Sequence, residues 1–263
     1  RWPSLNQNHW PTFTGIRKHL ETPPGNTIVW RYIGLEKFLD LLTHHRLFFT
    51  NARNFTDGYE VSLPANIVAS KRKELSKKGL TGRDFEEELA AFEWTNRPMR
   101  DLTLVNCWSL GQDESYALWK IYLGGFRAGV AIRTNLSRLR KSLEGGNDPF
   151  PEDIYVGKVQ YKRFFPEKDL SRFSLVTTKR QFYEYEKELR LFILHFPKSE
   201  GGIKPPYDFS VGRHINVDLS ILIDRLYLSP FVAPWFSESM KRILSKVAPF
   251  LPERIVASSI RDR

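Results

Sequence analysis

Short apolar, β-rich runs mixed with segments of helical periodicity most strongly constrain the fold of this chain. Some of these predicted strands are separated by a helical segment and others are not, so strands and helices do not strictly alternate. The predicted strands are residues 28–33, 47–49, 102–108, 128–132, 154–161, 189–196, 225–228 and 254–257. Strict alternation would favour a doubly wound sheet. The observed order instead predicts an α+β fold with a mixed, largely antiparallel sheet and flanking helices.

The flanking helices are predicted from apolar side chains that recur at the spacing of one helical face. They are residues 35–42, residues 60–100 with a break at 78–79, a helix N-capped by Asp113 and ended by Gly124, residues 173–185 and residues 236–247. Glycine after the last periodic residue and a short polar side chain before the first are the expected ends of such helices.

One domain accounts for most of the chain. The 263 residues are 41% hydrophobic, which is enough apolar material for a sizeable core. Residues 1–27 are rich in proline, asparagine and threonine and predict an irregular N-terminal arm. No internal repeat or low-complexity linker divides the remainder, so residues 28–263 are predicted to form a single domain. No run approaches the roughly 18 apolar residues of a membrane-spanning helix, so no membrane partner is expected.

A single cysteine, Cys107, bears on both compartment and chemistry. One thiol cannot form an internal disulfide, which favours a reducing compartment and predicts a cytoplasmic protein. Its position in an apolar run favours a buried packing role, with a nucleophilic role as the alternative.

The chain is strongly basic, with 40 lysines and arginines against 30 acidic residues and a net charge of +10. Such a surface attracts polyanions, including nucleic acid. The charge is spread over several clusters: 71–73, 77–78, 138–141, 179–180 and 261–263. A solvated surface that favours solubility explains this distribution equally well.

The familiar signatures of phosphate-loop, dinucleotide-fold and zinc proteins are missing from the sequence. It contains no glycine-rich loop followed by Lys-Ser/Thr, no dinucleotide glycine fingerprint and no zinc-type Cys/His spacing. No metal site is therefore predicted, and hydrolase triads gain no support.

Several segments, taken in order, resemble a large bacterial and phage-associated family defined by a domain of unknown function. They are residues 29–34, 38–42, 46–51, 54–60, 105–109, 117–122, 129–132, 159–162, 185–190, 223–230 and 256–258. They correspond to an aromatic-Arg-Tyr first strand, a Phe-Asn-Asp-like loop, a Cys-Phe-Ser-like strand, a Trp-x-x-Tyr helix and a Tyr-Glu-Lys-Glu-x-Arg strand. The chain has Gly58 where the family tends to have proline and Leu189 where it tends to have tryptophan.

The order of these segments also resembles the plan of the ADP-ribosyltransferases, which implies an ADP-ribosyltransferase-like fold with NAD as substrate. Cleavage of the nicotinamide–ribose bond passes through an oxocarbenium-like transition state that one carboxylate can stabilise without a metal. The resemblance makes Glu188 that carboxylate. Residues i and i+2 of a strand share a face, so Glu186 is the second catalytic candidate, which orients or deprotonates an acceptor.

The candidate NAD-binding residues come from three further segments. Arg31 is expected to hold the pyrophosphate by bidentate pairing, and Ser109 to bond the nicotinamide ribose. Tyr32, Trp119 and Tyr122 are expected to stack on a ring.

Each candidate also has a structural interpretation. Glu186 and Glu188 could form a charged strand face paired with Lys187 or Arg190, and Arg31 could be an ion-pair partner of Glu188. Side chains at the spacing of Trp119 and Tyr122 commonly belong to a core. The loop residues Asn54, Asp57 and Glu60 are further site candidates, and turn formation explains Asn-x-x-Asp-Gly equally well.

Two functions follow as expectations. The first is an NAD-consuming ADP-ribosyltransferase-like enzyme, acting as a toxin or phage-defence effector on a nucleic-acid or protein acceptor. This function predicts that Glu188 and Arg31 line one cleft. The alternative is a non-catalytic nucleic-acid-binding module of a bacterial defence or mobile-element protein, which uses the basic clusters and the abundant aromatic residues.

Overall fold

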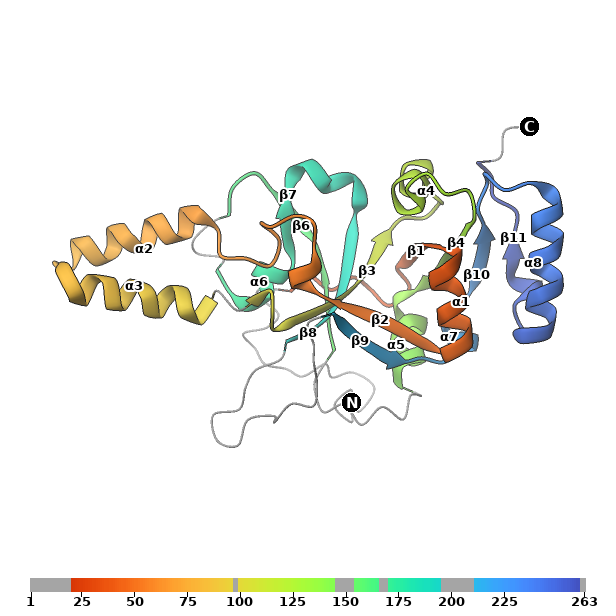
Figure 1. Cartoon of the computed structure of the whole chain (residues 1–263), viewed down its shortest axis with the longest axis horizontal. Helices are drawn as coiled ribbons and strands as arrows, with labels where there is room; N and C mark the ends of the chain where they lie inside the picture. The colour runs from red at the N-terminus through yellow and green to blue at the C-terminus, as the bar shows by residue number, and fades with distance from the viewer. Residues whose placement is uncertain (1–19, 97–98, 145–153, 166–169, 195–210, 261–263) are drawn as a thin grey trace.

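A mixed, mostly antiparallel open sheet with helices on its flanks forms the centre of the molecule (Figure 1). The computed structural model describes residues 20–96, 99–144, 154–165, 170–194 and 211–260. Nine strands of the described residues form this sheet: β1 (Ile28–Gly34), β2 (Arg46–Asn51), β3 (Thr103–Leu110), β4 (Gly129–Asn135), β5 (Tyr155–Lys158), β8 (Glu188–Leu194), β9 (Gly212–Asn216), β10 (Arg225–Leu228) and β11 (Ile255–Val256). The predicted α+β class is confirmed at this level.

The strand order along the main path is β11-β10-β4-β1-β3-β2-β9, and β8 pairs with both β3 and β5. Every pairing in this sheet is antiparallel except that of β10 with β11. A second sheet pairs β6 (Gln160–Lys162) with β7 (Thr178–Arg180) in parallel.

A fork in the sheet positions the cavity described below. β8 runs along one side of β3 over seven residue pairs. The other side of β3 is shared, because β2 pairs with it at Leu104 and Val105 whereas β1 pairs with it at Ser109 and Leu110. β1 and β2 therefore separate beside the middle of β3. We call this opening the strand fork.

Helices cover both faces of the sheet and extend from its ends. Those of the described residues are α1 (Leu35–His44), α2 (Ala65–Lys77), α3 (Gly82–Asn96), α4 (Tyr116–Leu123), α5 (Leu136–Glu144), α6 (Arg172–Val176), α7 (Leu219–Leu222) and α8 (Pro234–Val247). Short 3-10 segments add η1 (Ala52–Asn54), η4 (Gln181–Glu186) and η5 (Pro252–Arg254). In Figure 1, α2 and α3 form a hairpin at one end of the molecule, whereas α8 lies at the other end.

The apolar core lies on both faces of the sheet, as the cover of helices requires. On one face, α1, α5, α7 and α8 contribute to a large cluster that includes Phe38, Leu139 and Leu244. On the other face, α4 packs against β1 through Trp119 and Tyr32. Cross-strand partners point to the same face, so the registers of β1, β3 and β8 decide which side chains can meet.

The sequence predicted most elements, including the break between α2 and α3, but some local predictions were wrong. Ser115, not Asp113, caps α4, and its hydroxyl accepts a hydrogen bond from the Leu118 amide. Residues 173–185 are not largely helical, because β7 interrupts them. The predicted strand 154–161 divides into β5 and β6, and β9, α5 and α7 were not predicted.

Two predictions reach beyond the described residues. Residues 20–27 of the predicted arm contain no helix or strand, and the rest of the arm, residues 1–19, lies outside the described residues. The predicted strand 189–196 corresponds to β8 as far as Leu194, and its last two residues also lie outside them. Within the described part of the chain, no helix has the length and apolar character needed to cross a membrane.

Candidate functional site

A cavity of about 670 Å³ occupies the strand fork. Its walls come from β1, β2 and β3 together with α1, Tyr122 and His214. Pockets that bind drug-sized ligands and cofactors usually measure about 300–1,000 Å³ and combine aromatic walls with a few polar groups. The aromatic wall residues are Trp30, Tyr32, Phe48 and Tyr122, and the basic ones are Arg31, Lys37 and Arg46. Two acidic residues, Glu36 and Asp40, also line the cavity, so its wall carries both signs of charge.

Arg31 reaches into the fork from β1. Its Nη1 donates a 2.7 Å hydrogen bond to the carbonyl oxygen of Cys107, and its guanidinium carbon lies 5.8 Å from the centre of the Trp108 ring. No ion pair between Arg31 and Glu188 occurs, so the interpretation of Arg31 as the partner of Glu188 is wrong for the described structure. The side chain instead fills part of the gap that β1 leaves beside β3.

The strand register separates Arg31 from the carboxylate candidates. Arg31 faces the side of its partner Ile132, whereas Trp30 and Ser109 are partners that face the opposite side, together with Glu188. Arg31 and Glu188 therefore start from opposite faces of the sheet, and only Arg31 lines the cavity, so the expectation that both line one cleft is wrong. The cavity spans the fork, and this is why Arg31 and Ser109 both line it.

The aromatic candidates divide into cavity wall and core. Tyr122 is 41% exposed, lines the cavity and lies over Tyr32 with ring centres 6.3 Å apart. The Tyr32 hydroxyl accepts a hydrogen bond from the Ser115 amide at 2.7 Å, which holds that ring in the wall. Trp119 is fully buried and its Nε1 donates to Glu114. Trp119 is a core residue, so its prediction as a ring-stacking residue gains no support from the geometry.

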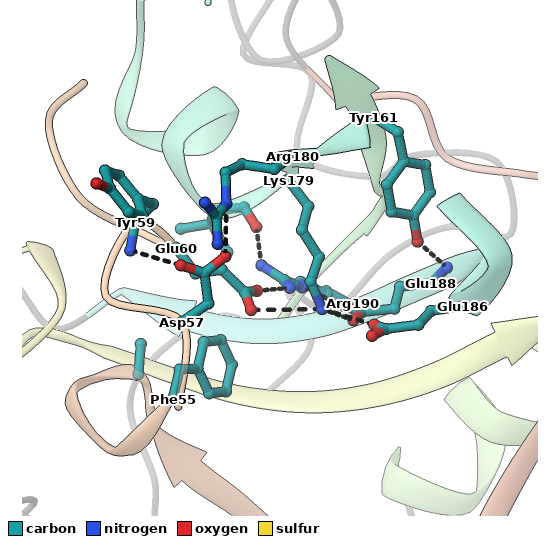
Figure 2. A network of polar contacts seen from close by, with 12 residues as sticks. Phe55, Asp57, Tyr59, Glu60, Tyr161, Lys179, Arg180, Glu186, Glu188 and Arg190 are labelled. Atoms are coloured by element: carbon teal, nitrogen blue, oxygen red, sulfur yellow. Dashed lines mark hydrogen bonds and ion pairs between the residues drawn. The ribbon is translucent and has the colours of Figure 1, made fainter. Parts of the chain in front are cut away.

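Five charged side chains, Lys179 at their centre, form a buried cluster that we call the carboxylate network (Figure 2). Its members are Glu60, Lys179, Glu186, Glu188 and Arg190. The Lys179 ammonium lies 2.6 Å from Glu186, 2.8 Å from Glu188 and 3.3 Å from Glu60. The three carboxylates therefore share this one buried ammonium group.

Arg190 is the second cation of the network and has no exposed surface. Its Nε donates to the second carboxylate oxygen of Glu188 at 2.6 Å, and its Nη1 donates to the carbonyl oxygen of Val176 at 2.8 Å. Its Nη2 donates to Glu60. The interpretation of Glu188 as a partner of Arg190 is confirmed, and Glu60 joins the cluster from the loop after η1.

The balance of charge sets the protonation of the network. Three carboxylates face two cations, so ionisation of all five would leave an unbalanced buried negative charge. Burial, followed by a hydrogen bond with Glu188, raises the pKa of Glu186 to about 8. Burial also opposes ionisation of Glu188, but the charge of Arg190 overcomes it and holds the Glu188 pKa well below its usual range. These opposite shifts favour a protonated Glu186 beside an ionised Glu188.

The backbone brings the two carboxylates together by a route that the sequence pattern did not predict. Glu186 ends the 3-10 helix η4 and does not belong to a strand, while Glu188 begins β8. The Lys187 backbone between them is left-handed, with φ of 45°. The expectation that both residues share a strand face is therefore wrong, although both side chains reach Lys179.

The network adjoins the cavity through β3. Glu188 is the direct cross-strand partner of Ser109, and Arg190 is the partner of Cys107. Ser109 and Cys107 both line the cavity, whereas Glu186 and Glu188 do not. One strand thus separates the buried carboxylates from the cavity wall.

Cys107 has the environment of a packing residue. Burial, followed by the negative charge of Glu188, raises the pKa of the Cys107 thiol to about 12. A thiol with such a pKa is a poor nucleophile because little thiolate forms near neutral pH. This supports the packing interpretation.

Lys179 is the site residue that sequence analysis missed as a candidate. It appeared only as part of a basic cluster, within a segment predicted to be helical. A helical assignment hides the alternation of β7, which turns Lys179 inward and leaves Thr178 and Arg180 half-buried. No local motif marks Lys179, because its partners come from three other segments of the chain.

Comparisons with protein-family models, curated proteins and solved structures found no match. In the described ranges, no group of three or more histidine, cysteine, aspartate or glutamate residues is arranged to hold a metal ion.

Proposed function

We propose that the chain binds NAD in the strand fork and cleaves the nicotinamide–ribose bond, as an ADP-ribosyltransferase-like enzyme does. One observation carries the proposal: two adjacent carboxylates, held in opposite protonation states, lie one strand away from a cavity of nucleotide size. Pairs of carboxylates with pKa values driven apart are the usual basis for separate acid, base and electrostatic roles. The family resemblance and the order of its segments point to the same chemistry.

Dinucleotide binding uses the cations and rings of the cavity. A pyrophosphate suits the bidentate guanidinium of Arg31, which enters the fork beside the Cys107 carbonyl. The Tyr122 ring, partly exposed at the wall, offers a stacking surface to nicotinamide or adenine. Ser109 lies on the same wall and can bond a ribose hydroxyl.

Bond cleavage uses the ionised carboxylate. The C–N glycosidic bond breaks, its electron pair leaves with nicotinamide, and positive charge develops on the ribose carbon. Glu188 accepts one hydrogen bond at each oxygen from the two cations of the network, and a further one from the protonated carboxyl group of Glu186. A carboxylate has about four lone-pair sites, so Glu188 retains capacity for a ribose hydroxyl. The proposal requires the nicotinamide ribose to pass Tyr122 and approach Glu188 beside Ser109.

The acceptor step uses Glu186. A hydroxyl or amino group attacks the ribose carbon and loses a proton, which an ionised Glu186 can accept. With a pKa of about 8, Glu186 becomes available as a base only as the pH rises toward that value. Transfer or hydrolysis should therefore accelerate between about pH 6.5 and 8.5.

The test is release of nicotinamide from NAD by the purified chain, with Glu188→Gln and Glu60→Gln measured in parallel. Glu60 is the matched control, since it contacts the same two network cations from the loop after η1, whereas Glu188 is the cross-strand partner of Ser109 on the cavity wall. Loss of the electrostatic partner should slow release by about 100- to 1,000-fold in Glu188→Gln. Glu60→Gln should retain a much higher rate. Equal loss in both variants, or no release and no NAD binding by calorimetry, overturns the proposal.

A further inference from the structure

A second cavity, of about 260 Å³, adjoins the carboxylate network. Glu60 and Lys179 line it, and they are members of the network. The remaining walls come from the loop before α2, the start of α2, the end of β6 and β7. This volume lies below the usual range for cofactor sites, so the cavity suits a group no larger than one nucleobase or sugar.

Exposed aromatic rings stand at this cavity. Tyr59 is 71% exposed and Phe164 is 65% exposed, and both line it. Phe182, which is 80% exposed, follows Gln181, whose side chain accepts a 2.7 Å hydrogen bond from Arg163 of the same cavity. Tyr59 and Phe164 thus expose two rings at one cavity, and exposed apolar surface rimmed by polar residues commonly marks an interaction site.

The charge that this surface presents to solvent is positive. Lys162, Arg163 and Arg180 line the cavity. The acidic lining residues are Asp57 and Glu60, whose side chains are 5% and 8% exposed and already hold ion pairs. The carboxylates are thus covered and neutralised.

Arg180 shows how rings and cations are combined here (Figure 2). Its guanidinium lies 4.6 Å from the centre of the Tyr59 ring and 5.7 Å from that of Tyr183, while its Nε donates to Asp57 at 3.1 Å. The Asp57 contact orients the cation against the exposed ring. A stacked ring beside an oriented guanidinium offers both a base-stacking surface and a phosphate contact.

We propose that this second cavity and its rim bind single-stranded nucleic acid, with one base stacked on Phe164 or Tyr59 and the backbone phosphates on Arg163, Lys162 and Arg180. Alternating aromatic rings and cations are how sequence-tolerant single-strand sites work, because every base has a stacking face and every nucleotide a phosphate. Duplex DNA keeps its bases stacked internally, so it cannot use the rings. The site does not depend on NAD chemistry.

The test is fluorescence anisotropy of a labelled 12-nucleotide single-stranded DNA titrated with the full chain, in 50 to 200 mM salt without NAD. Phe164→Ala should weaken binding by about 5- to 100-fold, the loss expected for one stacked base. Arg163→Gln should reduce the slope of log affinity against log salt by about 0.7, the loss of one phosphate contact.

Two matched variants control for exposed rings and cations in general. Phe126 is 79% exposed at another cavity, and Lys246 is exposed on α8 at the far end of the molecule (Figure 1). Phe126→Ala and Lys246→Gln should leave the affinity within about twofold of wild type. The proposal is overturned if no binding occurs at 50 mM salt, if Phe164→Ala and Phe126→Ala behave alike, or if a duplex binds as tightly as the single strand. Nicotinamide release is measured separately, so either proposal can fail alone.

Discussion

Replacement of Arg190 by methionine tests the energetic role of the carboxylate network. Arg190 has no exposed surface and donates to Glu188, Glu60 and the Val176 carbonyl oxygen. Methionine fills much of the space but leaves two buried carboxylates with only Lys179 as a cation. Removal of one partner from a buried ion pair costs about 3–5 kcal/mol. For a chain of this size, that lowers the melting temperature by about 6–20 °C.

The assay is urea and thermal unfolding followed by circular dichroism, with the double variant Glu60→Gln/Arg190→Met beside the single ones. Neutralising Glu60 removes one of the buried carboxylates that lost its Arg190 partner. The free energy of unfolding of the double variant should therefore be about 1 kcal/mol or more higher than the sum of the two single losses predicts. A loss below about 1 kcal/mol in Arg190→Met, or strict additivity in the double variant, would refute the claim that these charges depend on one another.

Two further predictions concern titration. The folded-state pKa of Glu186, about 8, exceeds the usual 4.5, so its protonated form contributes stability that is complete below about pH 4.5 and lost as pH rises through 8. In urea unfolding, the free energy of unfolding of the wild type should fall between about pH 6 and 8 relative to that of Glu186→Gln. Glu184→Gln changes an exposed residue of the same 3-10 helix, so its pH dependence should match that of the wild type. The partly buried Cys107 thiol, with its raised pKa, should react with iodoacetamide at pH 8 about 100-fold or more slowly in the folded chain than in urea, and equal rates would contradict its packing role.

Sequence patterns predicted the parts of the fold that depend on local order. The apolar run of β1 and the glycine that ends α4 are signals contained within a few neighbouring residues, so the sequence alone predicts them. Gly124 adopts a left-handed backbone with φ of 56°, the conformation expected where a helix stops. β7 and β9 were missed because both are short and largely polar, and their pairing depends on distant strands.

Likewise, the sequence predicted some residues of the candidate site and missed others. Glu188 and Ser109 were named from the resemblance, and the register makes them cross-strand partners. Neither the alternative ion pair between Arg31 and Glu188 nor their shared cleft occurs, since a sequence cannot show that β1 and β2 share one side of β3. Lys179 was missed because its ion pairs reach Glu60, 119 residues away, Glu186 at the end of η4 and Glu188 at the start of β8.

The most direct test of the central claim is a crystal structure of Glu188→Gln soaked with NAD, which measures the distance from residue 188 to the nicotinamide ribose. The proposal predicts a dinucleotide in the strand fork, with its pyrophosphate on Arg31. A ribose hydroxyl should lie about 3 Å from the glutamine side chain, beside Ser109. An empty fork at saturating NAD, or a nucleotide bound with its ribose away from residue 188, would contradict the proposed chemistry.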